Sequence, residues 1–405
     1  MKVVAIISEY NPFHNGHEYQ ISKLRQMLGD DIAVVAIMSG NYTQRGEVAV
    51  ADKTVRARAA VECGVNLVLE LPFPYSMSSA EFFAKSGVRI AHEIGVVDYL
   101  AFGSESGDIR QLTDIAAIMQ SDEYSLMLDT LAADPDYRDY GYPELCQASL
   151  ERVYGRDISR ESLSPNNILA IEYIKAISSL GSTITPITVR REGAGYLDII
   201  NPMAEFQSAS AIRQELEAKN ASALDYVPLY AKKIYTEAMS DGKMPSDASR
   251  LDYSVIASFR LNSPTLHPDI QDASGGLYNR LCDLSAEANS ISSLTAMAET
   301  KKYTKARIRR AIWNTFFGVT SSDVRALPSY TQVLAMDSIG RAVLREIKRR
   351  SDFPVITKPA SYKEHSDEVI RQYELSLRAD SVYQLTLKKP NSGRFSLTFT
   401  PYVKD

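Results

Sequence analysis

Two histidines three positions apart carry the clearest chemical signal in the sequence. His14 and His17 flank Gly16 in the run SEYNPFHNGH, which directly follows a short apolar segment. We expect that segment to be a strand and the residues after it to begin a helix. The free N–H groups and the dipole at the start of a helix bind phosphate, and glycine lets a ligand approach the backbone closely. The pattern therefore predicts a phosphate site.

An HxxH pair could instead bind a metal ion, but the neighbouring residues supply no third ligand of a zinc site, so we predict no metal there. Cys63, Cys146 and Cys282 are widely and irregularly spaced. This spacing excludes a disulfide framework and a CxxC zinc site, and it indicates a reducing, cytoplasmic setting. No apolar run approaches the roughly 20 residues of a membrane span, so we expect no membrane association.

Two further segments could bind a substrate. In SASAIR, Ser208 or Ser210 is expected to begin a helix with Arg213 in its first turn. Two hydroxyls, free N–H groups and a guanidinium predict a second phosphate site, and an ordinary helix cap is the alternative. The run GNYTQRG at residues 40–46 is a polar loop predicted at the carboxyl end of a strand, with an exposed turn as the alternative.

The scaffold for these segments follows from the apolar pattern of the first half. Short apolar runs at residues 3–8, 32–38, 66–71, 99–103 and 184–190 alternate with helical patterns at residues 17–28, 53–63, 79–94 and 168–179. This alternation predicts an α/β fold with a Rossmann-like, doubly wound parallel sheet. Ligands of such sheets bind at the carboxyl ends of the strands. Residues 108–160 are expected to form an acidic helical insertion, and Lys53 and Arg56 to lie on a solvated helix face.

The pattern changes near residue 220. Apolar runs typical of parallel strands stop there, and helical patterns follow at residues 229–239, 249–259, 284–297, 303–317 and 338–350. Apolar alternation at residues 382–387 and 394–400, around a Pro-Asn-Ser-Gly turn, predicts a short β-rich tail. We therefore predict a catalytic domain over residues 1–220 and a mainly helical domain with a short β tail over residues 221–405.

The net charge also changes sign near residue 220. The chain has a net charge of −5, but residues 1–220 carry −11 and residues 221–405 carry +6. Residues 301–310 contain six basic residues and no acidic one, and residues 340–350 repeat the bias. Two basic helix faces fit a nucleic-acid backbone, although a charge run is also typical of a solvated face. The candidate contacts are Lys301, Lys302, Lys305, Arg309, Arg310 and Arg345, whereas Tyr303 and Trp313 are expected in the core.

Longer motifs resemble one family over nearly the whole chain. HNGH matches the HxGH signature of the nucleotidyltransferase superfamily. The wider pattern resembles the bacterial tRNA(Met) cytidine acetate ligase family, and it consists of EYNPFHNGH, MSGNYTQRGEVAVADKTVRARAA, NLVLELPFPYSMSSAEFFAKSGV, FGSESGD, SPNNILAIEY, REGAGY, SASAIR and KKYTKARIRR. The resemblance implies a nucleotidyltransferase-type, ATP-binding sheet domain. It also implies an enzyme that activates acetate as acetyl-adenylate and acetylates N4 of the wobble cytidine of elongator tRNA(Met).

The resemblance further implies which residues act. His14, His17, Ser208, Ser210 and Arg213 would be catalytic and hold the triphosphate. The implied ATP contacts are Ile7, Ser8, Glu9, Tyr10, Asn11, Pro12, Phe13, His14, Asn15, Gly16, His17, Glu18, Tyr19, Gln20, Gly103, Asn166, Arg191 and Glu192. Gln44 and Arg45 are candidates for holding acetate or the cytosine edge, and the basic residues of the second half for binding tRNA. Mg²⁺ is expected with ATP, and coenzyme A is not.

Two other functions stay open at this point. HxGH alone also fits a small-molecule adenylyltransferase that acts on a phosphorylated vitamin, but such an enzyme needs no basic helical second half. A nucleotide-binding fold that has lost catalysis could bind RNA, but such a protein should have lost some of the catalytic residues.

The proposed first step needs no general base. Acetate is already ionised, so its activation needs alignment and charge neutralisation. No residue pattern identifies a proton acceptor for the cytosine amine.

Overall fold

A parallel sheet forms the centre of the computed structural model, which describes residues 1–138, 140–155, 163–191, 200, 206–261 and 269–405. Its first-half strands are β1 (Lys2–Ser8), β2 (Ile32–Ser39), β3 (Leu67–Leu71), β4 (Tyr99–Ser104) and β5 (Thr185–Arg190). They run parallel in the order β5-β4-β1-β2-β3. Each lies within one or two residues of a predicted strand, and the prediction of a wound parallel sheet is confirmed.

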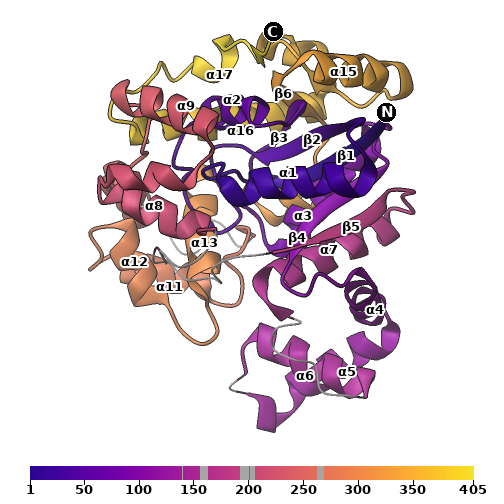
Figure 1. Cartoon of the computed structure of the whole chain (residues 1–405). Coiled ribbons are helices and arrows are strands. Elements are labelled where there is room, and N and C mark those ends of the chain that lie inside the picture. The colour runs from indigo at the N-terminus through magenta and orange to yellow at the C-terminus, as the bar shows by residue number, and fades with distance from the viewer. Residues whose placement is uncertain (139, 156–162, 192–199, 201–205, 262–268) are drawn as a thin grey trace.

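Helices cover both faces of the sheet (Figure 1). The helices α1 (Asn15–Leu28) and α2 (Lys53–Glu62) share one hydrophobic cluster with Val4 and Ile6 of β1. The helices α3 (Ala80–Glu93) and α7 (Pro165–Ser179) share another with Val3, Ala5 and Ile7. Successive strand residues point to opposite faces, which explains why the strands are apolar throughout.

The predicted acidic insertion is helical. It consists of α4 (Ile109–Met119), α5 (Asp122–Ala133) and α6 (Tyr142–Tyr154), which project from the end of the sheet opposite the two chain termini (Figure 1). Asp108 accepts hydrogen bonds from the first N–H groups of α4, and Ser121 does the same for α5. The side chains that begin these helices are therefore typical N-caps.

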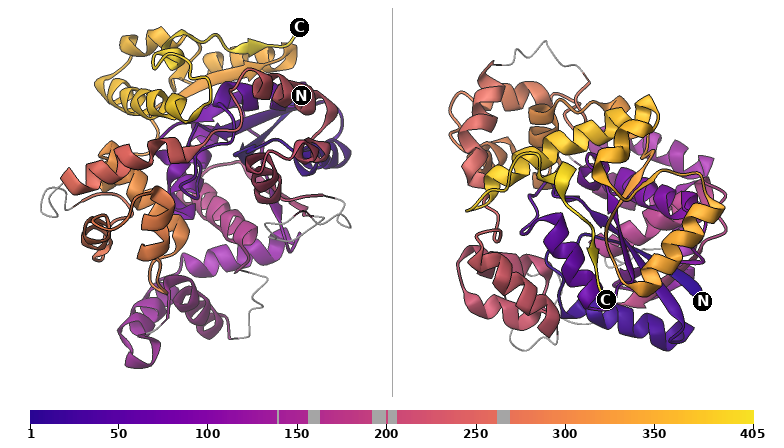
Figure 2. Two further views of the ribbon diagram at one scale, coloured as in Figure 1. Left: turned by 90° about the vertical axis from the view of Figure 1, so that its left-hand side faces the viewer. Right: turned by 90° about the horizontal axis from the view of Figure 1, so that it is seen from above.

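The second half of the chain interlocks with the sheet. Its helices are α8 (Ala209–Glu217), α9 (Leu229–Ser240), α10 (Asp252–Leu261), α11 (Leu277–Leu284), α12 (Ile291–Ala298), α13 (Lys305–Phe317), α14 (Ser321–Arg325), α15 (Ser338–Arg350), α16 (Asp367–Tyr383) and α17 (Phe395–Thr398). The single helix predicted over residues 284–297 is wrong, because Ser290 caps a separate helix there. The core of α10–α13 and α16 includes Tyr42 and Phe73 from the first half, and it buries Trp313 and Tyr303 as predicted. Figure 2 shows these helices wrapped around the sheet.

Two expectations about strands are wrong. β6 (Thr331–Met336) pairs antiparallel with β3, and β7 (Val355–Ile356) and β8 (Tyr402–Val403) pair with β6, so strands do not stop near residue 220. The predicted β tail is largely helical: Leu375, Ala379 and Tyr383 form a buried stripe of period four along α16, and residues 395–398 form α17. The division at residue 220 stays a prediction, although one sheet draws strands from both parts.

Candidate active site

The two histidines form the start of α1. His14 is the N-cap, and its Nδ1 accepts the Gly16 N–H at 3.1 Å. The Nδ1 of His17 accepts the His14 N–H at 3.1 Å, which completes a reciprocal capping box made from imidazoles. The rings lie 3.8 Å apart between centroids. A Cβ at Gly16 would lie 2.9 Å from the His14 ring, so a larger residue there would displace the ring.

Burial keeps both imidazoles neutral. Desolvation, followed by the charges of Arg191 and Arg213, lowers the pKa of His14 to about 3. Desolvation, His14 and Arg191 lower the pKa of His17 well below its ordinary 6.5. Because each Nδ1 accepts a backbone N–H, each neutral ring carries its proton on Nε2. The histidines are therefore poised to donate two hydrogen bonds to an anion beside the helix N-terminus.

A cavity of about 230 Å³ lies beside the histidines at the carboxyl ends of β1, β4 and β5. Most of the predicted ATP contacts line it: Ile7, Ser8, Glu9, Tyr10, Asn11, His14, Gly16, His17, Tyr19, Gln20, Gly103, Asn166 and Arg191. Four of them, Pro12, Phe13, Asn15 and Glu18, do not line it. Phe13 is buried and its N–H bonds the hydroxyl of Tyr235, while Glu18 is exposed on α1. The roles of these four residues in ATP binding stay predictions. Glu192 lies outside the described residues.

Several cavity residues were missed by the sequence reasoning. Phe102 and Val189 come from β4 and β5, and Leu169 and Tyr173 from α7. Because Phe102 precedes Gly103 at the end of a predicted strand, the sequence could have indicated that Phe102 lines the cavity. The other aromatic walls, Phe83 and Phe206, reach the cavity from distant segments. An apolar wall opposite polar groups is the usual form of a nucleotide base site.

Gly103 and Asn166 each make a structural contribution beside the cavity, through close packing and through a hydrogen bond respectively. A Cβ at Gly103 would approach the Cγ of Arg191 at 3.2 Å, so glycine lets that side chain lie across β4. Asn166 stands at the start of α7, where its Nδ2 donates to Glu105 at 2.6 Å. The Glu105 carboxylate also accepts the Asn167 N–H at 3.0 Å. The loop after β4 is thereby fixed to the N-terminus of α7.

The start of α8 contributes Ala209, together with the preceding Gln207, to the cavity wall, whereas Ser210 and Arg213 line the adjoining groove. The Oγ of Ser208 accepts the Ala211 N–H at 3.1 Å, as an ordinary N-cap does. Arg213 donates to the Asn11 carbonyl at 2.9 Å and to Glu47 Oε2 at 2.8 Å. It also donates to Ser210 Oγ at 3.2 Å. The guanidinium therefore braces the loop that precedes the histidines, and the roles of all three residues in catalysis stay predictions.

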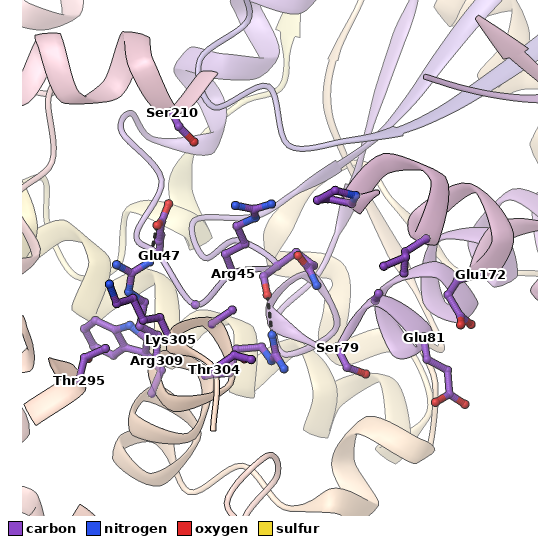
Figure 3. Close-up of a pocket in the computed structure, with 18 of the residues that line it drawn as sticks. Arg45, Glu47, Ser79, Glu81, Glu172, Ser210, Thr295, Thr304, Lys305 and Arg309 are labelled. Atoms are coloured by element: carbon purple, nitrogen blue, oxygen red, sulfur yellow. Dashed lines mark hydrogen bonds and ion pairs between the residues drawn. The ribbon is translucent and has the colours of Figure 1, made fainter. Parts of the chain in front are cut away.

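A groove of about 1720 Å³ adjoins the cavity, and Gln44 and Arg45 line both. Its walls come from the loop after β2, from α3 and α7, and from α13 (Figure 3). Gly46 presses against α13, because a Cβ there would lie 2.7 Å from the Arg309 Cβ and the Arg310 nitrogen. The loop thus lies between a small cavity and a much larger groove.

Comparison with known proteins identifies the relatives of this chain. The model of the HIGH nucleotidyl transferase family matches residues 1–396. The tRNA(Met) cytidine acetate ligase of Acetivibrio thermocellus is 34% identical over 416 residues, which cover 100% of this chain and 99% of that protein. The one from Clostridium botulinum (strain Okra) is 37% identical over 378 residues, 88% of this chain and 89% of that protein. The chain belongs to the tRNA(Met) cytidine acetate ligase family.

A solved member of the family shares the fold. The crystal structure of Thermotoga maritima TmcAL bound with alpha-thio ATP superposes with a TM-score of 0.90 at 29% identity, and the match covers 100% of this chain and 99% of that one. The sequence-based family assignment is confirmed, and so is the nucleotidyltransferase-type fold with its helical second half. In the described part of this chain, no helix is long and apolar enough to cross a membrane.

The basic residues of the segment 301–310 in this acetate ligase family member differ in exposure. Lys301, Lys302 and Lys305 are exposed, and Lys305 lines the groove. Arg309 bonds Glu47 at 2.6 Å and remains partly exposed (Figure 3). Arg310 is buried and bonds Asp272 at 2.9 Å, although it also lines the groove, and its contact with tRNA stays a prediction.

The second basic helix, α15, does not contribute to the groove. Arg345 is exposed on α15, which lies away from α13 in Figures 1 and 2, and it is absent from the groove wall. Its contact with tRNA stays a prediction.

The expectation for Lys53 and Arg56 is wrong, because both are buried. Lys53 Nζ lies 2.7 Å from Glu70 Oε1 and 2.6 Å from Asp380 Oδ2. Arg56 donates to the backbone carbonyl groups of Glu9 and Ala51. Both cations therefore hold the strand ends that carry the site, instead of facing solvent.

Proposed function

We propose that this protein is an ATP-dependent ligase that forms acetyl-adenylate from acetate and transfers the acetyl group to N4 of the wobble cytidine of elongator tRNA(Met), giving N4-acetylcytidine. The names of its relatives support the reaction and the tRNA(Met) substrate, and the ATP analogue bound to the related Thermotoga maritima protein supports ATP as co-substrate. The observation that carries the proposal is the pair of adjoining sites, a small cavity at the histidines and a large groove, which meet at Gln44 and Arg45.

The first step is the attack of the acetate oxygen on the α-phosphorus of ATP, with loss of pyrophosphate. The phosphate charge would meet two Nε2–H donors from His14 and His17 and the N-terminus of α1. Arg191 adds a positive charge at the cavity wall. The aromatic wall of Phe102 and Tyr173 offers an apolar surface for the adenine. No general base is needed, because acetate is already an anion.

Mg²⁺ would enter with the nucleotide. Magnesium sites in such enzymes combine one or two carboxylates with substrate phosphates. The described residues contain no cluster of three or more histidine, cysteine, aspartate or glutamate ligands. The residues present therefore do not fit a complete site made by the protein alone, and no step of the mechanism is routed through the metal.

The second step is the attack of the cytosine amine on the acetyl carbonyl, with AMP as the leaving group. The amine must leave the stacked anticodon to reach the cavity. The groove provides that approach, and Gln44 and Arg45 stand where the base would enter. Lys301, Lys302 and Lys305 would contact the RNA backbone, which positions the loop without reading its sequence.

Acetate-dependent exchange of labelled pyrophosphate into ATP tests the activation step. The proposal predicts exchange that requires acetate and needs neither coenzyme A nor tRNA. Adenylylation of a vitamin phosphate with no acetate-dependent exchange would instead identify a small-molecule adenylyltransferase. Binding of RNA without any exchange would identify a silent binding protein.

A further inference from the structure

One carboxylate of the cavity wall bonds the loop that borders the groove. Glu9 follows β1, and its Oε1 accepts the Gln44 N–H at 2.8 Å. It therefore reaches from the wall of the histidine cavity to the loop that also lines the groove. This is the passage through which an amine from the groove would reach an activated acetyl group.

A carboxylate is an unfavourable neighbour for a polyphosphate, because like charges at close range repel. The groups that suit phosphate, namely the imidazole donors and the helix N-terminus, belong to α1. Glu9 instead turns toward the loop at Gln44. The position of Glu9 therefore suits contact with the acetyl group and the incoming amine better than contact with the phosphates.

The surroundings of Glu9 favour a group that can take up a proton. Burial raises its pKa above the ordinary 4.5, opposed by the Gln44 N–H bond and by the charges of Arg213 and Arg45. Glu47 on the same loop raises the pKa further. On the other sides, the Arg56 guanidinium donates to the Glu9 carbonyl, and Tyr173 of α7 is close enough for the Glu9 charge to raise the pKa of its hydroxyl. A carboxylate whose pKa is raised toward neutrality is a better general base.

We propose that Glu9 is the proton acceptor of the transfer step, an inference that rests on the proposed function. The N4 nitrogen forms a bond to the acetyl carbon, and the bond from that carbon to the phosphate oxygen of AMP breaks. AMP leaves with the electron pair. The proton lost by the amine passes to the Glu9 carboxylate and from there to water when the products leave.

Glu9→Gln separates this role from a purely structural one. The amide oxygen of glutamine can still accept the Gln44 N–H, but glutamine cannot take up a proton. Acetate-dependent pyrophosphate exchange should fall far less than transfer, because activation needs no base. Transfer from preformed acetyl-adenylate to tRNA should fall by about 10²–10⁴-fold.

The pH profile gives a readout that altered packing would not move. In the unmodified protein, the single-turnover transfer rate should drop on the acid side as Glu9 becomes protonated, at a pH above its ordinary 4.5. Glu9→Gln should lack this limb. Glu93→Gln is the matched control, since Glu93 pairs with Arg89 on the surface of α3 and lines neither cavity.

Each remaining outcome overturns the inference. Normal transfer by Glu9→Gln would mean that the leaving phosphate or water takes the proton. Loss of exchange together with transfer would assign the carboxylate to the nucleotide or its metal, or to the fold. If the unmodified protein itself performs no exchange, the proposed function fails, and that result is distinct from both.

Discussion

Lys53 Nζ lies 2.6 Å from Asp380 Oδ2, and the two side chains are only 2% and 6% exposed. This pair joins α2 in the first half of the chain to α16 near its end. Asn41, at the start of the loop that carries Gln44, donates to the second oxygen of Asp380 at 2.8 Å. Glu70 of β3 also bonds Lys53. The helix α16 therefore helps to hold the loop between the cavity and the groove.

Removal of one partner from this buried network should be costly. Asp380→Ala leaves Lys53 and Asn41 short of partners, and we expect a loss of about 3–5 kcal/mol in the free energy of unfolding, measured by denaturant titration. The control is Arg58→Ala on α2, the helix of Lys53, because the ion pair of Arg58 with Glu237 is 40% and 45% exposed. That change should cost less than about 1 kcal/mol. Equal, small losses would show that the network is not important for stability.

Acid should weaken the ligand-free fold through the histidines. The pKa of His14 is about 3 in the folded chain and 6.5 when exposed, so the unfolded chain binds more protons between these values. Its contribution to stability is complete above pH 6.5 and is lost as the pH falls toward 3. His14→Asn keeps an N-cap acceptor for the Gly16 N–H but does not titrate.

Between pH 7 and pH 4, the His14→Asn variant should lose about 2–4 kcal/mol less of its unfolding free energy than the unmodified protein. Urea unfolding at a series of pH values measures this difference. Parallel curves for the two proteins would show that His14 is not held neutral by the fold.

The histidines should serve the activation step alone. His17→Ala removes an Nε2–H donor aimed at the phosphates, and acetate-dependent pyrophosphate exchange should fall by about 10²–10³-fold. Binding of tRNA, measured by filter retention, should be unchanged, because the groove and the exposed lysines are untouched. Equal losses of exchange and tRNA binding would indicate misfolding or a misplaced site.

Exposed and buried basic residues of one segment should behave differently. Replacing Lys301, Lys302 and Lys305 with alanine should weaken tRNA binding and reduce the slope of log affinity against log salt by up to about 2–3. Arg310→Ala should instead lower the melting temperature, because it leaves buried Asp272 unpaired, and should leave the salt slope unchanged. An unchanged slope in the lysine variant would remove this segment from the RNA interface.

Elements whose formation depends on neighbouring residues in the sequence were predictable from local sequence patterns. The strands and the helix at the histidines follow from apolar period and turn chemistry, so their bounds were predicted closely, and the insertion was predicted to be helical without bounds for its separate helices. The predicted solvated face at Lys53 and Arg56 was wrong because its partners, Asp380 and the carbonyl of Glu9, come from distant segments. Burial of Arg310 likewise depends on Asp272. The strand β6 was missed because its partner, β3, lies over 200 residues earlier.

The most direct test of the central claim is the product formed on tRNA. Purified protein is incubated with ATP, labelled acetate and bulk bacterial tRNA, in the absence of coenzyme A, and the RNA is digested to nucleosides. The account predicts label in N4-acetylcytidine, derived from elongator tRNA(Met) and dependent on both ATP and acetate. Absence of label from the RNA in a preparation that binds ATP would contradict it.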